Sequence, residues 1–292
     1  MSQRLGVLKT YKLFIGGKFP RTESGRYVQA TNPQTGEHLA NYCHASRKDL
    51  RDAVRAARKA LPGWASGATP YLKSQILYRA AEMLEGRKTA MATELETATG
   101  CSTKDAVADV NSAIDHLIHF AGWCDKFHQI FGAVNPVSSP HFSFSTHEPT
   151  GVVAVFCPED PPLAGLVASI APVILSGNTC VAIVSGKASL PAITFAETVA
   201  TSDLPAGVLN ILTSDGDELA ATAGSHMDIN AIVEASGNAE LYSKLQAEGA
   251  SNLKRISDRN LNRKEWLGES ARDPYAILNT VEVKTAWHPI GS

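Results

Sequence analysis

Two adjacent carboxylates, Glu159 and Asp160, are the first residues that could carry out chemistry, because they follow an apolar stretch and lie in a proline-rich loop. Paired acids act as general acid and base where their surroundings push their pKa values apart. The sequence places no other candidate group beside them. We therefore interpret them as solvated loop acids and keep acid-base catalysis as the alternative.

A second candidate lies on one predicted helix, which carries His116, His119, Cys124 and His128. His116 and His119 have i, i+3 spacing and could share a metal ion. The neighbouring residues continue an ordinary amphipathic stripe, which favours exposed or capping histidines. We expect no metal site.

The cysteines are five in number and include no CxxC pair. Three of them sit inside apolar patterns, as small core residues do. The spacing indicates neither a disulfide framework nor a zinc site. The five are Cys43, Cys101, Cys124, Cys157 and Cys180.

Composition excludes several classes of protein. The net charge is -2 and no run of Lys or Arg occurs, so we expect no nucleic-acid partner. The apolar runs are too short to span a bilayer, and the first residues lack a secretory signal pattern. We expect no membrane partner and a cytoplasmic location.

The first half of the chain is predicted to be mainly helical, and its helices carry the histidines named above. Short extended pieces over 12–45 precede a helix that begins at a capping-box pattern of Ser46 and Asp49. Further apolar stripes predict helices near 70–84, 90–99 and 103–131.

Apolar strands alternate with helices in the second half. Strands are predicted at 151–156, 179–184, 209–213, 229–233 and 253–256, with helices at 162–176, 190–202, 216–224 and 238–248. Strands that are apolar on both faces and alternate with helices specify a parallel sheet. The fold class is α/β: a Rossmann-like doubly wound sheet with N-terminal helices and a small β element.

That β element consists of a hairpin and a tail strand. Phe142 and Phe144 alternate with serines, and Val281, Val283, Thr285 and Trp287 alternate with polar residues. We expect a cofactor-type domain over 1–132 and 149–260, an oligomerisation hairpin and tail over 133–148 and 275–292, and a linker over 261–274.

Several stretches resemble the aldehyde dehydrogenase superfamily. They include "YKLFIGGKFPRTESGRYVQATNPQTGEHLA", "AIDHLIHFAGWCDKFHQIFG", "EPTGVVAVFCPEDPPLAGLVASIAPVILSGNTCVAI" and "NTVEVKTAWHPIG". The resemblance implies a cofactor domain of the family with its oligomerisation strand. The chain is similar to the non-catalytic second half of tandem, family-16 type aldehyde dehydrogenases.

The resemblance also marks where the family's motifs fail. The family's Trp-Asn pair is Glu159-Asp160 here, and its Lys-Pro-x-Glu, which grips the adenosine ribose, is 183–186. Its Phe-Thr-Gly-Ser, near the cofactor's diphosphate, is 234–237. Its Glu-Leu-Gly-Gly, with the general base, is replaced by 258–260, and the chain then passes to the tail without a catalytic domain. Acids at these positions disfavour an oxyanion and a diphosphate.

We therefore assign no catalytic residue and expect no cofactor, with weak NAD binding as the alternative. Residues assigned to a vestigial cofactor site are Cys157, Pro158, Ser185, Ser214, Gly216, Ser236 and Gly237.

The expected function is a pseudoenzyme subunit that stabilises an active aldehyde dehydrogenase paralogue, or its own copy, through the tail strand. In the family this strand crosses to a partner, which implies β-augmentation; the alternative is pairing with the chain's own hairpin. The predicted interface residues are Phe142, Phe144, Val281, Val283, Lys284, Thr285 and Trp287. Two other functions remain open: an NAD(P)-dependent oxidoreductase acting on aldehydes, and a nucleotide sensor that uses the same cleft.

Overall fold

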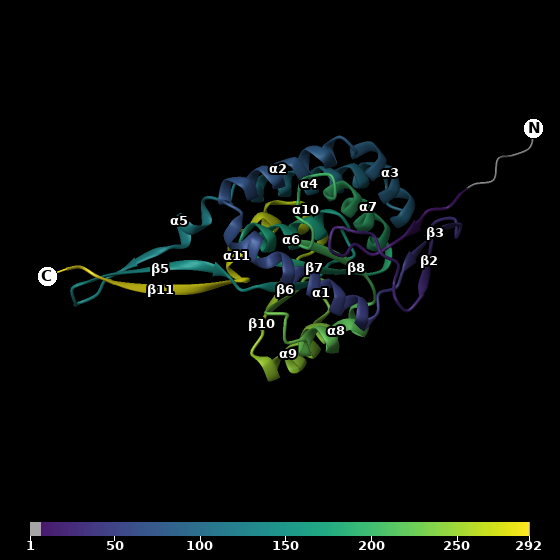
Figure 1. Ribbon diagram of the computed structural model, residues 1–292. Coiled ribbons are helices and arrows are strands. Elements are labelled where there is room, and N and C mark those ends of the chain that lie inside the picture. Colours follow the sequence, from purple (N-terminus) through teal and green to yellow (C-terminus); the bar gives the residue numbers. More distant parts are fainter. Residues whose placement is uncertain (1–6, 292) are drawn as a thin grey trace, which may run out of the picture.

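The computed structural model describes residues 7–291 and consists of a body and a projecting arm. In Figure 1 the sheet lies inside the body between two layers of helices, and the arm extends from one end with the C-terminus at its tip. The first residues of the expected cofactor domain and the last residue of the tail lie outside the described part.

The central sheet has five parallel strands in the order β10-β9-β6-β7-β8. Every residue of β6, β7, β8 and β9 is buried, which is why their sequences are apolar without alternation. The predicted fold class is confirmed. The strands are β6 Val152–Phe156, β7 Thr179–Val184, β8 Leu209–Thr213, β9 Ala231–Glu234 and β10 Arg255–Asp258.

The last of these strands differs from the sequence prediction. It begins at Arg255, because Leu253 has a left-handed backbone (φ 55°) and is 94% exposed. An apolar residue at a solvent-facing turn imitates the start of a strand in the sequence pattern.

Helices cover both faces of the sheet and define two cores. One face packs under α2, α3, α4, α6 and α7, and the other under α1, α8 and α9. Alternate residues of one strand enter the two cores: Val153 and Val155 face the first, and Val152 and Ala154 the second. The helices on the faces are α1 Arg47–Pro62, α2 Pro70–Glu85, α3 Lys88–Thr99, α4 Thr103–Ala121, α6 Ala164–Leu175, α7 Ser189–Val199, α8 Gly216–Ser225 and α9 Ala239–Gly249. Short turns are η1 Gly63–Gly67, η2 Gly186–Ala188 and η3 Ala250–Asn252.

The expected helix over 103–131 is wrong in its length. Helix α4 ends at Ala121, and after a turn at Gly122 a short helix, α5 Phe127–Phe131, leads toward the arm. The apolar stripe continues through both helices, so periodicity alone could not locate the break.

A small N-terminal sheet of β1 Thr10–Tyr11, β2 Tyr27–Thr31 and β3 His38–Cys43 lies beside β8. Between β1 and β2, Phe14 exchanges both backbone hydrogen bonds with Ile211 of β8 (2.9 and 2.8 Å). The outer edge of β8 is therefore partly paired by the chain itself.

Residues 259–280 between β10 and β11, which we call the linker and which contain the expected linker over 261–274, are folded, although their polar composition gave no clear pattern. It forms α10 Arg263–Leu267, η4 Glu269–Arg272 and α11 Tyr275–Leu278. Trp266 is 1% exposed, and the Arg259 guanidinium lies 5.1 Å from its ring centroid. Arg259 also donates to the carbonyls of Ala168 on α6 and Ala271, so it ties the linker to the body.

The arm is a three-stranded antiparallel sheet of β4 Ala133–Asn135, β5 His141–Pro149 and β11 Val281–Pro289, in the order β11-β5-β4. Strand β11 pairs with β5 along its whole length, from Val281 opposite Pro149 to Pro289 opposite His141. The structure thus has the home pairing that we treated as the alternative. In the described chain, the other edge of β11 pairs with no strand.

None of the helices in residues 7–291 has the length and hydrophobicity that a bilayer-spanning segment requires.

Candidate functional site

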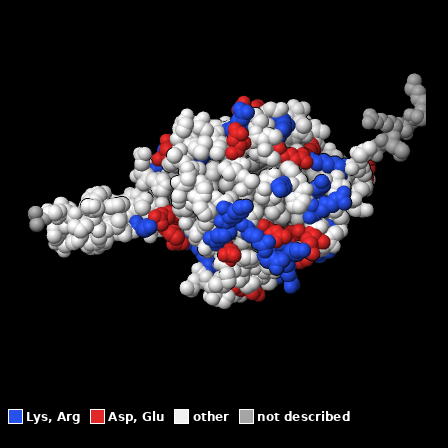
Figure 2. All heavy atoms as spheres, in the orientation of Figure 1, with Lys and Arg blue, Asp and Glu red and all other residues white. Residues whose placement is uncertain are grey.

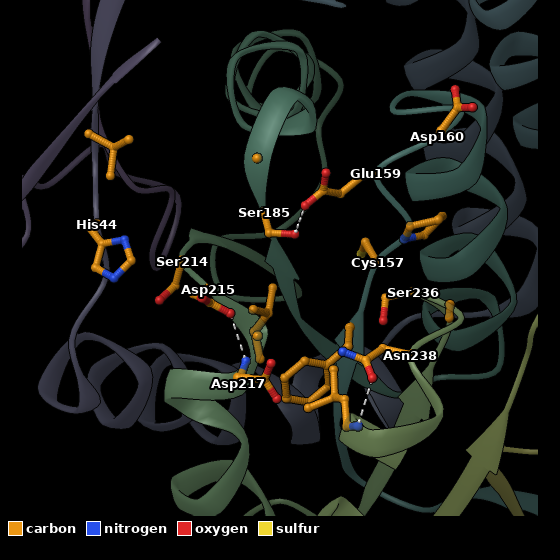
Figure 3. A pocket seen from close by; sticks show the side chains of 18 of the residues that line it. His44, Cys157, Glu159, Asp160, Ser185, Ser214, Asp215, Asp217, Ser236 and Asn238 are labelled. Carbon is orange, nitrogen blue, oxygen red and sulfur yellow. Dashed lines mark hydrogen bonds between the residues drawn. The ribbon is translucent and has the colours of Figure 1, made fainter.

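A cleft of about 730 Å³ opens at the carboxyl ends of the sheet strands (Figure 3). Its walls come from the loops after β6, β7, β8 and β9. From β6 the chain adds β7 and β8 on one side and then returns to add β9 and β10 on the other, so the winding direction reverses at β6. In open α/β sheets, ligands bind in the crevice at such a switch point. Both the place and the volume are those of a small-molecule site.

The structure brings the predicted site residues together. Cys157, Pro158, Ser185, Ser214, Gly216 and Ser236 all line this cleft. Gly237 is not among the lining residues; it has φ 76° in the turn that leads into α9. Their role in binding stays a prediction.

Cys157 lines the cleft, and its thiol is buried. It is 2% exposed, its Sγ lies 3.7 Å from the Val155 carbonyl oxygen, and its amide donates to Ile183. Burial raises the pKa of its thiol far above the ordinary value. A thiol of this kind has almost no thiolate at neutral pH.

Glu159 and Asp160 point to different groups (Figure 3). A Glu159 oxygen accepts a hydrogen bond from Ser185 Oγ at 2.6 Å, whereas Asp160 forms an ion pair with Arg263 of α10. Because each carboxylate has its own partner, they do not share a proton as a catalytic pair would. Both side chains are solvent-exposed, in agreement with the prediction of solvated loop acids, and each also makes one specific contact.

Glu234, the last residue of β9, turns back into the protein. Its carboxylate accepts from the amide of Ser236 at 2.8 Å and from the Ser236 hydroxyl. The amide of Gly237 also hydrogen-bonds to it, and burial raises the pKa of this carboxyl. The chain's own acid thus occupies amides that could otherwise face an anion.

The two helix N-termini at the cleft are also occupied by the chain's own side chains. Asp215 caps α8 by accepting from Asp217 N, and Asn238 caps α9 by accepting from Glu240 N and Leu241 N at 3.0 Å. These contacts satisfy amides that a helix end leaves free.

Sequence reasoning missed several residues of the cleft wall, of which two come from the linker. Leu261 and Trp266 belong to the linker and line the cleft opposite the sheet loops. The only signal was a tryptophan within a polar stretch, which does not indicate the partner it packs against.

The histidine prediction is wrong for His116. It is fully buried, its Nε2 lies 2.8 Å from the Trp266 carbonyl oxygen, and its Nδ1 accepts from Arg272 Nε at 3.2 Å. Burial lowers its pKa to about 4. Within residues 7–291 no cluster of three or more potential metal ligands occurs.

The arm is the second candidate site, because its surface is almost uncharged and exposes several large apolar side chains. Figure 2 shows it almost entirely white. Residues 132–147 and 285–291 contain no Lys, Arg, Asp or Glu. Val283 is 64% exposed, Trp287 58% and Phe142 46%.

Three of the predicted interface residues make contacts within their own chain. Val281 is 2% exposed and therefore packs within its own chain, so its assignment to an interface is wrong. Lys284 pairs with Glu148 at 2.9 Å on the neighbouring strand. Thr285 Oγ1 lies 2.8 Å from Ser145 Oγ.

This fold and cleft define a Rossmann-like α/β protein with a ligand site at the switch point. A profile of the aldehyde dehydrogenase family matches residues 19–258, and the chain belongs to that family. Retinal dehydrogenase 2 of Gallus gallus is 33% identical over 254 residues, which cover 86% of this chain and 48% of that protein. An aldehyde dehydrogenase of Aspergillus niger is 28% identical over 274 residues, covering 94% and 53%. The chain spans about half the length of the curated relatives it matches.

Among solved structures, an aldehyde dehydrogenase from Bacillus cereus in complex with NAD+ aligns with a TM-score of 0.81 at 25% identity, covering 86% of this chain and 50% of that one. A betaine aldehyde dehydrogenase from Staphylococcus aureus, also with NAD+, shares the fold with a TM-score of 0.80 at 23% identity.

These complexes correct the expectation of no cofactor. The Bacillus cereus enzyme, half of which aligns with this chain, was solved in complex with NAD+. Substitution of a few motif residues was therefore insufficient ground to expect that a chain of this family lacks a cofactor.

Proposed function

We propose that the chain is a nucleotide-binding, non-catalytic subunit of an aldehyde dehydrogenase assembly. Its cleft holds an NAD-type dinucleotide, and its arm docks against a subunit that carries a complete active site.

The observation that carries the assembly role is the composition of the arm. Both faces of this sheet expose large apolar side chains, with Val134 and Phe142 on one and Val283 and Trp287 on the other. A thin sheet of this kind has no core of its own, and a larger uncharged apolar surface marks a contact site. Within residues 7–291 the outer edge of β11 pairs with no strand, so its backbone groups are available for strand addition to a partner sheet.

The cleft supports dinucleotide binding, provided that the side chains occupying its backbone amides, Glu234, Asp215 and Asn238, move aside. Phe156, Ile183 and Leu241 supply apolar walls, and Glu159 with Ser185 supplies polar groups at one end. The turn before α9 can receive a diphosphate once the Glu234 carboxylate leaves its amides. When bound, NAD supplies a hydride acceptor.

The residues present argue against aldehyde oxidation by this chain. The thiol in the cleft, Cys157, is buried and protonated. Asp160 is held by Arg263, and a carboxylate offers no hydrogen-bond donor to a developing oxyanion. Residues 259–280, between β10 and β11, form the folded linker.

The assembly role is tested by co-expressing the chain with a complete aldehyde dehydrogenase of the same organism and measuring the mass of the eluted complex by light scattering. We expect a joint complex that the double variant Val283→Lys, Trp287→Lys loses. Met227→Lys is the matched control, because Met227 is 79% exposed on the body and its replacement should leave the complex intact. Elution of the wild-type chain as a monomer beside its candidate partner would refute the role.

A second candidate is an NAD(P)-dependent oxidoreductase acting on aldehydes, which the cleft and the family favour. It predicts NADH formation by the purified chain supplied with NAD and an aldehyde. A nucleotide sensor predicts binding without turnover and without a partner, so the same two experiments separate the three functions.

A further inference from the structure

The inference concerns the end of the cleft at which Glu159 meets Ser185, and it rests on the proposed binding of a dinucleotide. Strands β6 and β7 are adjacent and parallel, with Phe156 opposite Ile183. The loops that follow them therefore emerge side by side at the same edge of the sheet, and Glu159 reaches from the first loop to the second.

The second loop leaves room for this carboxylate. Gly186 has φ 52°, and a Cβ built on it would lie 2.6 Å from a Glu159 oxygen. The absence of a side chain at Gly186 leaves the space that the carboxylate occupies. The family resemblance implied that the ribose contacts were lost at 183–186, whereas the structure brings a carboxylate there from the neighbouring loop.

The charge of Glu159 is not neutralised. Within residues 7–291 it has no ion pair, whereas the adjacent Asp160 is paired with Arg263. Lys187 lines an adjoining cavity together with Tyr42 and makes no ion pair with Glu159. Glu159 is exposed to the cleft, and only one of its oxygens accepts from Ser185.

A carboxylate with free lone pairs accepts hydrogen bonds from two neighbouring hydroxyls. In dinucleotide-binding folds an acidic residue takes this role toward the ribose of NAD, and it disfavours the 2'-phosphate of NADP by like-charge repulsion.

We propose that Glu159, positioned by Ser185 and Gly186, binds the ribose diol of the dinucleotide and selects NAD over NADP. In this chain the selecting carboxylate comes from the loop after β6, and Ser185 in the loop after β7 holds it by a hydrogen bond.

The test is isothermal titration of the full chain with NAD and NADP separately, for wild type and three variants. We expect wild type to bind NAD at least roughly tenfold more tightly than NADP, because a single like charge near the phosphate is enough for that ratio. Glu159→Gln keeps the shape and removes the charge, and it should bring the two affinities within about threefold by strengthening NADP and weakening NAD.

Two further variants are controls. Asp217→Asn removes another acid of the same cleft, on the first turn of α8, and should change both affinities by the same factor. Ser185→Ala should reduce the NAD preference without abolishing it, because it removes the hydrogen bond that positions Glu159 and keeps the charge.

The outcomes are distinct. Equal wild-type affinities, or a Glu159→Gln variant that keeps the wild-type ratio, would overturn the selectivity and leave the proposed function standing. If neither dinucleotide binds wild type, the selectivity and the nucleotide-binding part of the proposed function both fail. The assembly experiment then decides the rest independently.

Discussion

Acidification should detach the linker from the body, and His116 is the residue that makes this measurable. His116 lies on α4 and joins it to the linker through the Trp266 carbonyl and Arg272 Nε. Its contacts require a neutral ring, with Nε2 donating and Nδ1 accepting. A second proton on Nδ1 would meet the donor of Arg272 instead of an acceptor.

The magnitude follows from the pKa of His116, which burial lowers from 6.5 to about 4. A base whose folded pKa is depressed loses stability as the pH falls, because the unfolded chain takes up the proton first. Above pH 6.5 both states are neutral and nothing is lost. At pH 5 the unfolded histidine is protonated and the folded one is not, which costs about 2 kcal/mol of the free energy of unfolding.

The assay is urea unfolding of wild type and His116→Gln at pH 7.5 and pH 5.0. Glutamine donates and accepts at similar positions but does not titrate. Lowering the pH from 7.5 to 5.0 should therefore reduce the free energy of unfolding of wild type by about 2 kcal/mol relative to that of the variant. Lys264→Gln, an exposed change in the same linker helix, is the control and should show no such movement. A wild-type-minus-variant difference that is equal at both pH values would refute the reasoning.

Three further perturbations have signs set by the structure. Asp109 is buried and its pKa is raised to about 6. As the pH rises from 4 to 7, the free energy of unfolding of wild type should therefore fall by up to about 3 kcal/mol relative to that of Asp109→Asn, as unfolding experiments across that range would measure. Glu234→Gln should tighten NAD binding about tenfold in titration calorimetry, since it removes a charge beside the diphosphate turn. Gly151→Ala should destabilise the fold by about 2–4 kcal/mol in urea unfolding, because its φ is 136° and a Cβ would lie 2.2 Å from Asn230 Oδ1. Gly36→Ala, at φ 71° in open space, should cost only about 1–2 kcal/mol.

Each of these has a contradicting result. An Asp109→Asn difference that is flat with pH would mean that the buried carboxyl titrates normally. Unchanged NAD affinity in Glu234→Gln would mean that the turn does not face the ligand. Equal costs for the two glycine changes would mean that the contact with Asn230 relaxes freely.

The sheet could be predicted because its signal is local. Uninterrupted apolar runs such as Val152–Phe156 specify strands buried on both faces, and the alternation with helices then specifies a parallel sheet. The arm was predictable for a related reason, since Phe142 and Phe144 alternate with serines at a period of two.

The site could be predicted only as a set of positions. Residues after successive parallel strands must meet at one edge of a sheet, which is why Cys157, Ser185 and Ser236 line one cleft. The partner of each side chain depends on rotamers and on distant packing. Nothing local in the sequence indicated that Glu159 would bend toward Ser185 or that Glu234 would bond back to its own turn.

The linker shows the same limit. His116 looked like a surface residue, because the element that buries it lies about 150 positions away in the sequence. A long-range contact of this kind leaves no periodic signal.

The pairing of Phe14 with Ile211 also bears on how the purified protein will behave in storage. That contact occupies part of the outer edge of β8, so fewer backbone groups of the central sheet are available there to pair with another molecule. Strand β11, by contrast, is nine residues long and has one open side in the described chain. Turbidity or fibre growth in concentrated samples should therefore begin at the arm, and a proline or an extra lysine on β11 is the change that would keep such samples clear.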